Sequence, residues 1–433
     1  MTSEVVSPFT VRLAALTLEL IERRSLSLEA AYLEASKLVE RGDLNAVKLA
    51  RIALRHFAKA DLLLDAQRLS DLPLRRRCAF RVVFAMMKEG LNPSGIDVGL
   101  LSGRLRVLLT RRWLELADQL AAEKPPLQRT SLEHSFPPWI AEEVAKFLGP
   151  EEAIKLIKAC DRRTIWVRVN ELKISVNEAA RRLRREGLEI REDRDFPELL
   201  EVLNVEEVPL PVQKMAERGL VLVQDKGSVA VVHALGQARR LLVLDAAAAP
   251  GVKTSAIQQL SANEAEVVAV DVSRRRVREM KALLSKLGVR NVHIVTSDSR
   301  LLRFARKFDK VLLDAPCTNS GALASDPALR LSLWKPPRLD RYTTLQLELL
   351  RTTYSQLKEG GALVYSTCSL LSSEGEAVVE RLDQGALRAE GVLGEPGYRA
   401  FSCSGGVRRL YPHIHRTVGF FIAKVQKTEG GDG

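Results

Sequence analysis

Residues 240–254 read RLLVLDAAAAPGVKT, and residues 266–272 read EVVAVDV. Each stretch contains an apolar run of the length of a buried strand that ends in an aspartate, Asp245 or Asp271. Further runs of this kind, VHIVTSD, DKVLLDAPC, GALVYSTC and GFFIAKV, alternate with helix-like stretches towards the C-terminus. This alternation predicts a doubly wound, mostly parallel α/β sheet. Ligands of such sheets bind at the carboxyl ends of the strands.

Hydrophobic periodicity divides the chain into three predicted domains. Residues 1–130 show apolar side chains at three- and four-residue spacing, which predicts an all-helical domain. Residues 131–235 predict a small mixed α/β module, with a strand at 164–170 followed by a basic helix. The sheet domain is then expected over residues 236–433. A cluster of Arg75, Arg76, Arg77 and Arg81 has two interpretations, a solvated helix face or an RNA-facing patch.

Composition limits the class of protein. The 433 residues carry 66 Lys and Arg against 54 Asp and Glu, a formal net charge of +12, which favours an anionic partner such as nucleic acid. A hydrophobic content of 46% excludes a disordered chain. The apolar runs are too short to span a membrane. Five scattered cysteines predict free thiols in a reducing, cytoplasmic compartment.

The loop after the first strand predicts a nucleoside site. AAAPGVKT, at residues 247–254, matches neither phosphate-binding glycine motif. An acidic strand end beside it suits a cationic or zwitterionic ligand such as S-adenosylmethionine. Asp271, at the end of the next strand, is placed to accept the ribose hydroxyls. Asp298, after the third strand, is placed to meet the adenine amino group.

Two cysteines follow neighbouring strands, Cys317 in DAPC and Cys368 in STC. A thiolate is a natural nucleophile for carbon 6 of a cytosine ring. Its addition makes carbon 5 electron-rich, so that carbon 5 can take a methyl group from a sulfonium donor. Asp314 is placed to stay protonated or to share a proton with ring nitrogen 3. The second thiol is then available to assist release of the covalent adduct.

Together these motifs resemble the RNA cytosine-5 methyltransferase family of the Sun/Fmu type. The similar stretches are AAAPGVKT, DAPCTNSG and STCS, with GLVLVQDKGS at 219–228, WVRVN at 166–170, SFPPWIAEEV and TVGFFIAKV. The resemblance covers about residues 131–427. It implies a Rossmann-like methyltransferase fold. The helical start resembles the NusB-like RNA-binding domain of the members that modify ribosomal RNA.

The resemblance implies a role for each matching residue. Cys368 would be the nucleophile, Cys317 the releasing thiol and Asp314 the residue that meets the base. Lys253 is assigned to the donor loop and not to a chemical step. The donor contacts implied are Ala247, Ala248, Ala249, Pro250, Gly251, Val252, Lys253, Asp271, Arg276, Asp298 and Asp314.

The chain departs from the family pattern at several positions. Ala247 stands where the family commonly has Cys, and Val252 where it has a second Gly. Thr318 and Asn319 replace a Ser and a Gly after the proline-cysteine pair, and Val418 replaces an Asp. Neither reactive thiol is affected. Because valine restricts φ, the donor loop cannot need a left-handed residue at position 252.

Two other functions remain open on the sequence alone. A DNA cytosine-5 methyltransferase would use Cys317 as its nucleophile, and an RNA-binding protein with an inactive methyltransferase fold would use neither thiol. Ribosomal RNA is favoured over transfer RNA by the NusB-like start. No metal is required by the chemistry, and His413 and His415 are expected to be packing or surface residues.

Overall fold

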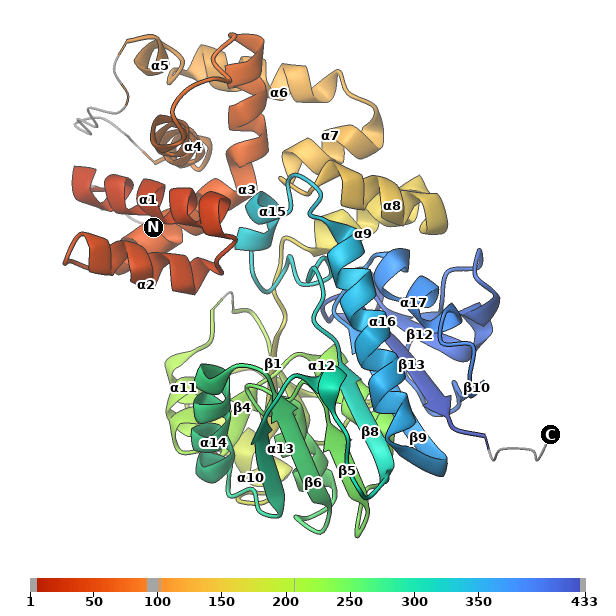
Figure 1. Ribbon diagram of the computed structural model, residues 1–433. Coiled ribbons are helices and arrows are strands. Elements are labelled where there is room, and N and C mark those ends of the chain that lie inside the picture. The colour runs from red at the N-terminus through yellow and green to blue at the C-terminus, as the bar shows by residue number, and fades with distance from the viewer. Residues whose placement is uncertain (1–5, 92–100, 102, 206, 429–433) are drawn as a thin grey trace. The chain divides into compact units, whose positions relative to one another are not determined.

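The computed structural model describes residues 6–91, 101, 103–205 and 207–428. The chain separates into two compact units (Figure 1). The first unit comprises Met1–Asp161 and Ala322–Pro337, and the second comprises Arg162–Gly321 and Arg338–Gly433. The chain thus leaves the second unit at Gly321 and returns to it at Arg338.

The first unit is helical throughout its described residues. Its early helices begin at side-chain caps: Ser7, Ser27 and Asp43 each accept a backbone N–H of the following helix. Its later helices begin with a proline, whose fixed φ suits the first turn. The helices are α1 Pro8–Arg24, α2 Leu28–Leu38, α3 Leu44–Ala66, α4 Leu74–Lys88, α5 Arg104–Val107, α6 Arg111–Ala122, α7 Pro126–Glu133, α8 Pro138–Leu148, α9 Pro150–Ala159 and α15 Ala328–Ser332.

The division predicted at residue 130 falls inside α7. Helices α8 and α9, which the sequence placed in the mixed module, cluster with the helical unit. Segment 322–337 also belongs to this unit. Its Arg330 is buried and donates to the carbonyl oxygens of His134 and Cys160. Trp334 packs edge-on against Phe57 with ring centroids 5.0 Å apart.

The arginine cluster at the start of α4 is only partly a surface feature. Arg81 is buried in the helical core, where it forms ion pairs with Asp61 of α3 and Glu22 of α1. Arg77 also pairs with Glu22, at 2.6 Å. Both interpretations of the cluster are therefore wrong for Arg81. The carboxylates that pair with it come from other helices and were not identified from the sequence pattern.

The second unit begins with a four-stranded antiparallel sheet in the order β2-β3-β1-β4. Its chain order is β1 Ile165–Val169, α10 Val176–Arg185, β2 Ile190–Glu192, β3 Leu199–Val202, α11 Leu210–Glu217 and β4 Val221–Val223. This is a ferredoxin-like β-α-β-β-α-β arrangement. Ile165, Val167 and Val169 point to one face, into a core shared with the helices. Trp166 and Arg168 therefore point to the other face.

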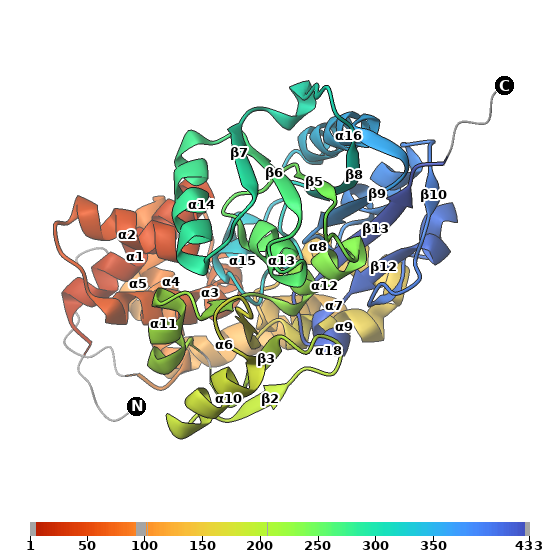
Figure 2. The ribbon, with the colours of Figure 1, turned by 90° about the horizontal axis from the view of Figure 1, so that it is seen from below.

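The larger sheet of this unit is the predicted Rossmann-like methyltransferase sheet, in the order β11-β12-β13-β9-β8-β5-β6-β7 with β10 beside β13 (Figure 2). The strands are β5 Leu242–Asp245, β6 Glu266–Asp271, β7 Val292–Thr296, β8 Phe308–Asp314, β9 Leu357–Thr367, β10 Ala386–Leu387, β11 Glu395–Pro396, β12 Val407–Leu410 and β13 Phe420–Gln426. Strands β5–β9 pair in parallel, as predicted. Strands β10–β13 pair antiparallel, so the sheet is mixed rather than mostly parallel.

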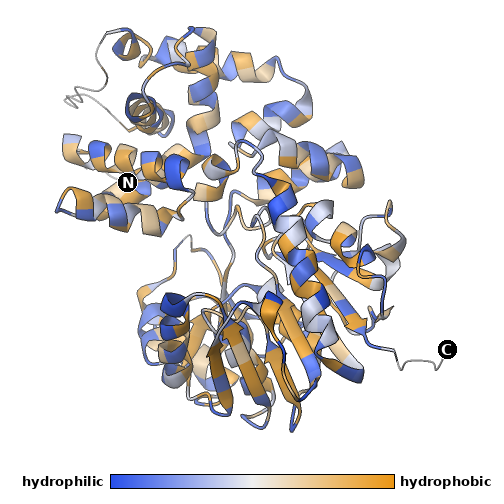
Figure 3. Cartoon of the chain, in the orientation of Figure 1, coloured by the Kyte–Doolittle hydropathy of each residue, from blue (hydrophilic) through white to orange (hydrophobic). Residues whose placement is uncertain are grey.

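Both faces of this sheet are covered. Val270 of β6 belongs to the core that includes residues of α16 (Leu339–Ser355) and α17 (Glu376–Glu380). Its neighbour Ala269 packs with Met280 and Leu284 of α14 (Arg274–Leu287) on the opposite face. The central strands are accordingly hydrophobic along most of their length (Figure 3). The remaining helices include α12 Lys226–Leu235, α13 Val252–Leu260 and α18 Pro412–His415.

Within the described residues, no helix has the length and hydrophobicity that crossing a membrane requires.

The buried ion pairs of Arg81 predict a large effect on stability. Replacing Arg81 with methionine leaves Glu22 and Asp61 without their buried cation, which should destabilise the helical unit by about 3–5 kcal/mol. Chemical denaturation followed by circular dichroism measures this change. Arg75→Met, at an exposed position of the same helix, is the control and should change stability by less than about 0.5 kcal/mol. Equal effects of the two substitutions would contradict this account.

Candidate functional site

The donor loop connects β5 to α13 through small residues. Gly251 has φ +95°, a left-handed conformation that favours glycine, and a Cβ there would lie 2.8 Å from Cγ of Met280. Val252 is the first residue of α13, which confirms that position 252 needs no left-handed residue. The loop is closed by a hydrogen bond of 2.7 Å from the Gly251 N–H to the Ala248 carbonyl oxygen.

Asp271 and Arg276 hold the donor loop from the neighbouring strand. Asp271 is buried at the end of β6, and its Oδ2 accepts the backbone N–H of Ala249 at 3.2 Å. Arg276 of α14 donates to the Ala249 carbonyl oxygen and forms an ion pair with Asp271 at 3.3 Å. The structure therefore brings these three predicted donor residues together.

The two other acidic strand ends differ in environment. Asp245 is fully buried, and burial raises its pKa to about 6. One of its oxygens accepts the Thr254 hydroxyl at 2.6 Å, and the other has no hydrogen-bond partner among the described residues. Asp298 caps the turn after β7 and pairs with Arg300 at 2.6 Å. A contact of Asp298 with adenine stays a prediction.

The two cysteines converge. Strands β8 and β9 are paired in parallel with Asp314 opposite Ser366, so both chains leave the sheet at the same edge. The sulfur atoms of Cys317 and Cys368 lie 3.4 Å apart although 51 positions separate them in sequence. A hydrogen bond with Cys368, together with burial, holds the pKa of Cys317 well above its usual range. Cys317 is therefore a thiol at neutral pH.

Lys253 reaches out of the donor loop towards the cysteines. Its Nζ lies 2.5 Å from Oδ2 of Asp314, whose Oδ1 accepts the Ser366 hydroxyl at 2.8 Å. Burial disfavours the ammonium form, but the Asp314 carboxylate raises the pKa of Lys253 above its ordinary value. An ion pair thus stands beside the thiols. The sequence placed Lys253 in the loop and did not anticipate this contact.

Glu374, a residue not singled out in the sequence, joins the two cysteine loops. Its fully buried carboxylate accepts the Thr318 N–H at 2.9 Å, the Thr318 hydroxyl at 2.6 Å and the Ser369 hydroxyl at 2.6 Å. Gln346 of α16 adds a fourth hydrogen bond, at 3.1 Å. Because Thr318 follows Cys317 and Ser369 follows Cys368, one carboxylate fixes the spacing of both thiols. A single buried glutamate after a strand gives no periodic signal in the sequence.

Arg168, within the WVRVN stretch, contacts the helix that follows the donor loop. Its side chain is buried and donates to Gln224, to Gln259 at 2.6 Å and to the hydroxyl of Ser255 at 2.6 Å. Burial lowers the pKa of Arg168 to about 10, so it remains charged at neutral pH. Ser255 and Gln259 lie on α13, so the ferredoxin-like sheet is hydrogen-bonded to the helix that follows the donor loop.

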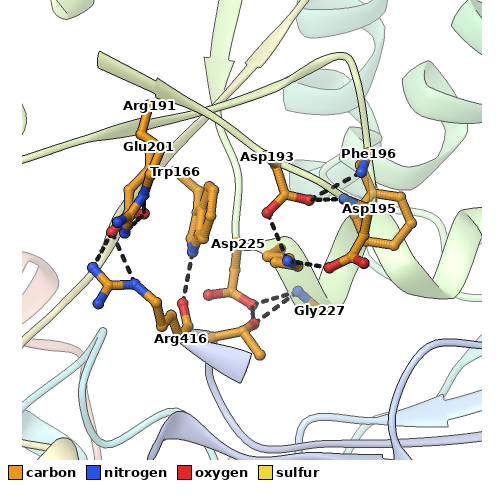
Figure 4. A network of polar contacts seen from close by, with 11 residues as sticks. Trp166, Arg191, Asp193, Asp195, Phe196, Glu201, Asp225, Gly227 and Arg416 are labelled. Atoms are coloured by element: carbon orange, nitrogen blue, oxygen red, sulfur yellow. Dashed lines mark hydrogen bonds and ion pairs between the residues drawn. The ribbon is translucent and has the colours of Figure 1, made fainter. Parts of the chain in front are cut away.

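A second polar network joins the ferredoxin-like module to the segment between α18 and β13 (Figure 4). Trp166 donates to the Arg416 carbonyl oxygen at 2.7 Å, and buried Glu201 pairs with Arg416 and Arg191. Lys226 bridges Asp193 and Asp195 at 2.6 Å each. Asp225, two positions before Gly227, caps α12 and accepts the Thr417 hydroxyl and the N–H of Val418. The GLVLVQDKGS stretch at 219–228 therefore connects the ferredoxin-like module to the segment before β13.

His, Cys, Asp and Glu side chains form no group of three or more able to hold a metal ion in the part of the chain that is described. His415 accepts the backbone N–H of Tyr411 at 3.0 Å.

Comparisons with known proteins agree with this geometry. The family described as 16S rRNA methyltransferase RsmB/F matches residues 232–426, and its ferredoxin-like domain matches residues 136–211. A Bacillus subtilis protein named probable ribosomal RNA small subunit methyltransferase B is 31% identical over 318 residues, which cover 71% of this chain and 69% of that protein.

Two archaeal proteins are also similar. The tRNA (cytosine(72)-C(5))-methyltransferase of Pyrococcus horikoshii is 36% identical over 223 residues, covering 50% of this chain and 54% of that protein. The crystal structure of a methyltransferase homolog from the same organism superposes with a TM-score of 0.61 at 33% identity, covering 70% of this chain and 99% of that one.

The Glu374 contacts predict a difference between two substitutions of Thr318. Thr318→Val removes the hydroxyl from a buried carboxylate, which should lower the free energy of unfolding by about 2 kcal/mol. Methyl transfer should also slow about tenfold, because the Cys317 loop loses part of its support. Thr318→Ser keeps the hydroxyl and should retain methyl transfer within about twofold. Radiolabelled methyl transfer and chemical denaturation measure these effects. Equal activity of the two variants would contradict a positioning role for Glu374.

Proposed function

The chain belongs to the RsmB/F family of S-adenosylmethionine-dependent RNA cytosine-5 methyltransferases, and we propose that it methylates small-subunit ribosomal RNA through Cys368 and Cys317. The observation that carries the proposed roles is the 3.4 Å separation of the two sulfurs beside the Lys253–Asp314 ion pair. One thiol suffices for attack on a pyrimidine, so a second at this distance indicates a second step. A reducing, cytoplasmic compartment would keep both thiols free.

The residues around the donor loop fit S-adenosylmethionine. Asp271 is fixed at the end of β6 as an acceptor for ribose hydroxyls. The unpaired, buried oxygen of Asp245 offers an acceptor to a cationic ligand. The small side chains within Ala247–Lys253 allow a ligand to approach the loop backbone closely around Gly251. When bound there, the donor supplies a sulfonium methyl group to the base.

We assign attack to Cys368. Its thiolate adds to carbon 6 of cytosine, the S–C bond forms, and electrons move through the ring to carbon 5 and nitrogen 3. Carbon 5 then takes the methyl group. Lys253 and Asp314 are paired beside the thiols. We propose that they meet the nitrogen edge of the base, where Lys253 offsets the negative charge that develops on the ring.

We assign release to Cys317. The proton on carbon 5 must leave before the bond between Cys368 and carbon 6 breaks. Cys317 first loses its own S–H proton to solvent. Because its pKa is raised, the thiolate so formed is a stronger base than an ordinary cysteine thiolate and can take the carbon-5 proton. Its sulfur is adjacent to the bond that breaks, which suits it to take the proton.

The helical unit and the ferredoxin-like module are proposed to hold the RNA. We propose that the helical unit is a NusB-like domain. Helix α10 carries exposed Arg181, Arg182, Arg184 and Arg185, and such a helix binds phosphates with strongly salt-dependent affinity. The target cytosine must leave its stack to reach Cys368, so a single-stranded loop or a flipped base is expected.

Substitution of the thiols tests their roles. Cys368→Ala should abolish methyl transfer, because no adduct forms, while retaining donor binding measured by calorimetry. Cys317→Ala should trap the protein covalently on RNA, visible as a slow band on a denaturing gel. Methyl transfer by Cys368→Ala at the wild-type rate would overturn the assignment. A covalent adduct trapped by Cys368→Ala but not by Cys317→Ala would also overturn it.

The RNA substrate is tested in cells that lack the protein. Bisulfite sequencing should show loss of one or a few 5-methylcytosines in small-subunit ribosomal RNA, with transfer RNA unchanged. Restoration by the wild-type chain, but not by Cys368→Ala, links the loss to catalysis. Loss confined to transfer RNA would contradict the proposed substrate. No lost site in any RNA would favour an RNA-binding protein without activity.

A further inference from the structure

Asn319 places a carboxamide against both thiols. Its Oδ1 accepts a hydrogen bond from Cys368 Sγ at 2.9 Å and a longer one from Cys317 Sγ at 3.6 Å. Each thiol has one hydrogen, so when the Cys317 S–H donates to Cys368, the Cys368 S–H is the one that donates to Asn319 Oδ1. The sulfurs and this oxygen form a closed group of three atoms within hydrogen-bonding reach of one another.

The backbone around Asn319 holds the amide there. Asn319 has φ +60°, a left-handed conformation that asparagine, aspartate and glycine tolerate best. The loop is tied to the end of β9, since the Gly321 N–H donates to the Cys368 carbonyl oxygen at 3.0 Å and the Ser320 and Ser369 hydroxyls lie 2.9 Å apart. The amide therefore belongs to a fixed turn.

The charges around the thiols come from three other elements. Glu374 and Asp314 are the nearby carboxylates, and Lys253 is the nearby cation. Lys253 favours a Cys368 thiolate but is itself paired with Asp314. A hydrogen bond from S–H to Oδ1 stabilises the protonated sulfur and disfavours the thiolate. The neutral acceptor thus opposes the effect of Lys253.

We propose that Asn319 is a latch that keeps Cys368 protonated in the enzyme without RNA, and that entry of the target base displaces the amide, after which the Cys368 proton passes to solvent and the thiolate forms. The proposal rests on the assignment of Cys368 as the nucleophile. It gives the resting enzyme a nucleophile that is protected from other electrophiles. Asn319 contacts the reacting sulfur itself and is not a remote support.

Alkylation of the RNA-free enzyme by iodoacetamide tests the latch, because only the thiolate reacts. Asn319→Gly keeps the left-handed turn and removes the acceptor, and Asn319→Asp keeps the acceptor and adds a negative charge. Alkylation is followed by mass spectrometry on the tryptic peptide 359–381, which contains Cys368, and on peptide 311–330, which contains Cys317.

The two variants should change the rate at Cys368 in opposite directions. At pH 7 Asn319→Gly should be alkylated about fivefold faster than the wild type, the effect of one lost hydrogen bond, with the rate profile shifted to lower pH. Asn319→Asp should be alkylated more slowly, with the profile shifted to higher pH. Asn204→Gly, at another left-handed asparagine with φ +57°, should match the wild type.

Two results would overturn the latch: an unchanged or slower rate for Asn319→Gly, or faster alkylation in both variants, which would indicate only a loosened loop. Thermal melting confirms that each variant is folded, and Asn319→Asp remains informative if the glycine variant is not. The measurement needs neither RNA nor methyl transfer. Its failure is therefore distinguishable from failure of the thiol roles, which the trapped adduct of Cys317→Ala reports.

Discussion

The parallel pairing of β8 with β9 is the constraint on which the site depends. Asp314 lies opposite Ser366 in this register, so the loops that carry Cys317 and Cys368 leave the sheet side by side. A slip of one residue would turn every side chain of one strand to the other face of the sheet and separate the thiols. The Glu374 carboxylate then fixes their spacing through hydrogen bonds to both loops.

The donor loop depends on a second set of constraints. Asp271 and Arg276 hold its backbone on one side, and Arg168 reaches α13 from the ferredoxin-like sheet on the other. Lys253 links this loop to Asp314, at the end of β8. The loop 247–253 and the two cysteine loops are thus each held by polar contacts to neighbouring elements. Such contacts are specific because each unpaired member would be costly.

Sequence periodicity predicted the alternating strands and helices, because buried strands and amphipathic helices leave strong local patterns. It also placed Cys317, Cys368 and Asp271 at strand ends. It predicted β13 from GFFIAKV but not its antiparallel pairing. It did not predict the short strands β10–β12, which have weak local signals, or the location of segment 322–337 in the helical unit. Glu374 and the Lys253–Asp314 pair were missed because most of their partners, Thr318, Gln346 and each other, lie about 30–60 positions away along the chain.

The central claim is that Cys368 attacks the base while Cys317 stands beside it. The most direct measurement uses wild-type enzyme, S-adenosylmethionine and substrate RNA carrying 5-fluorocytidine, whose fluorine blocks loss of a proton from carbon 5 and so stops the adduct before release. Tandem mass spectrometry should find the methylated fluorocytosine on peptide 359–381, attached to Cys368. Attachment to Cys317 on peptide 311–330, or no covalent adduct, would contradict the account.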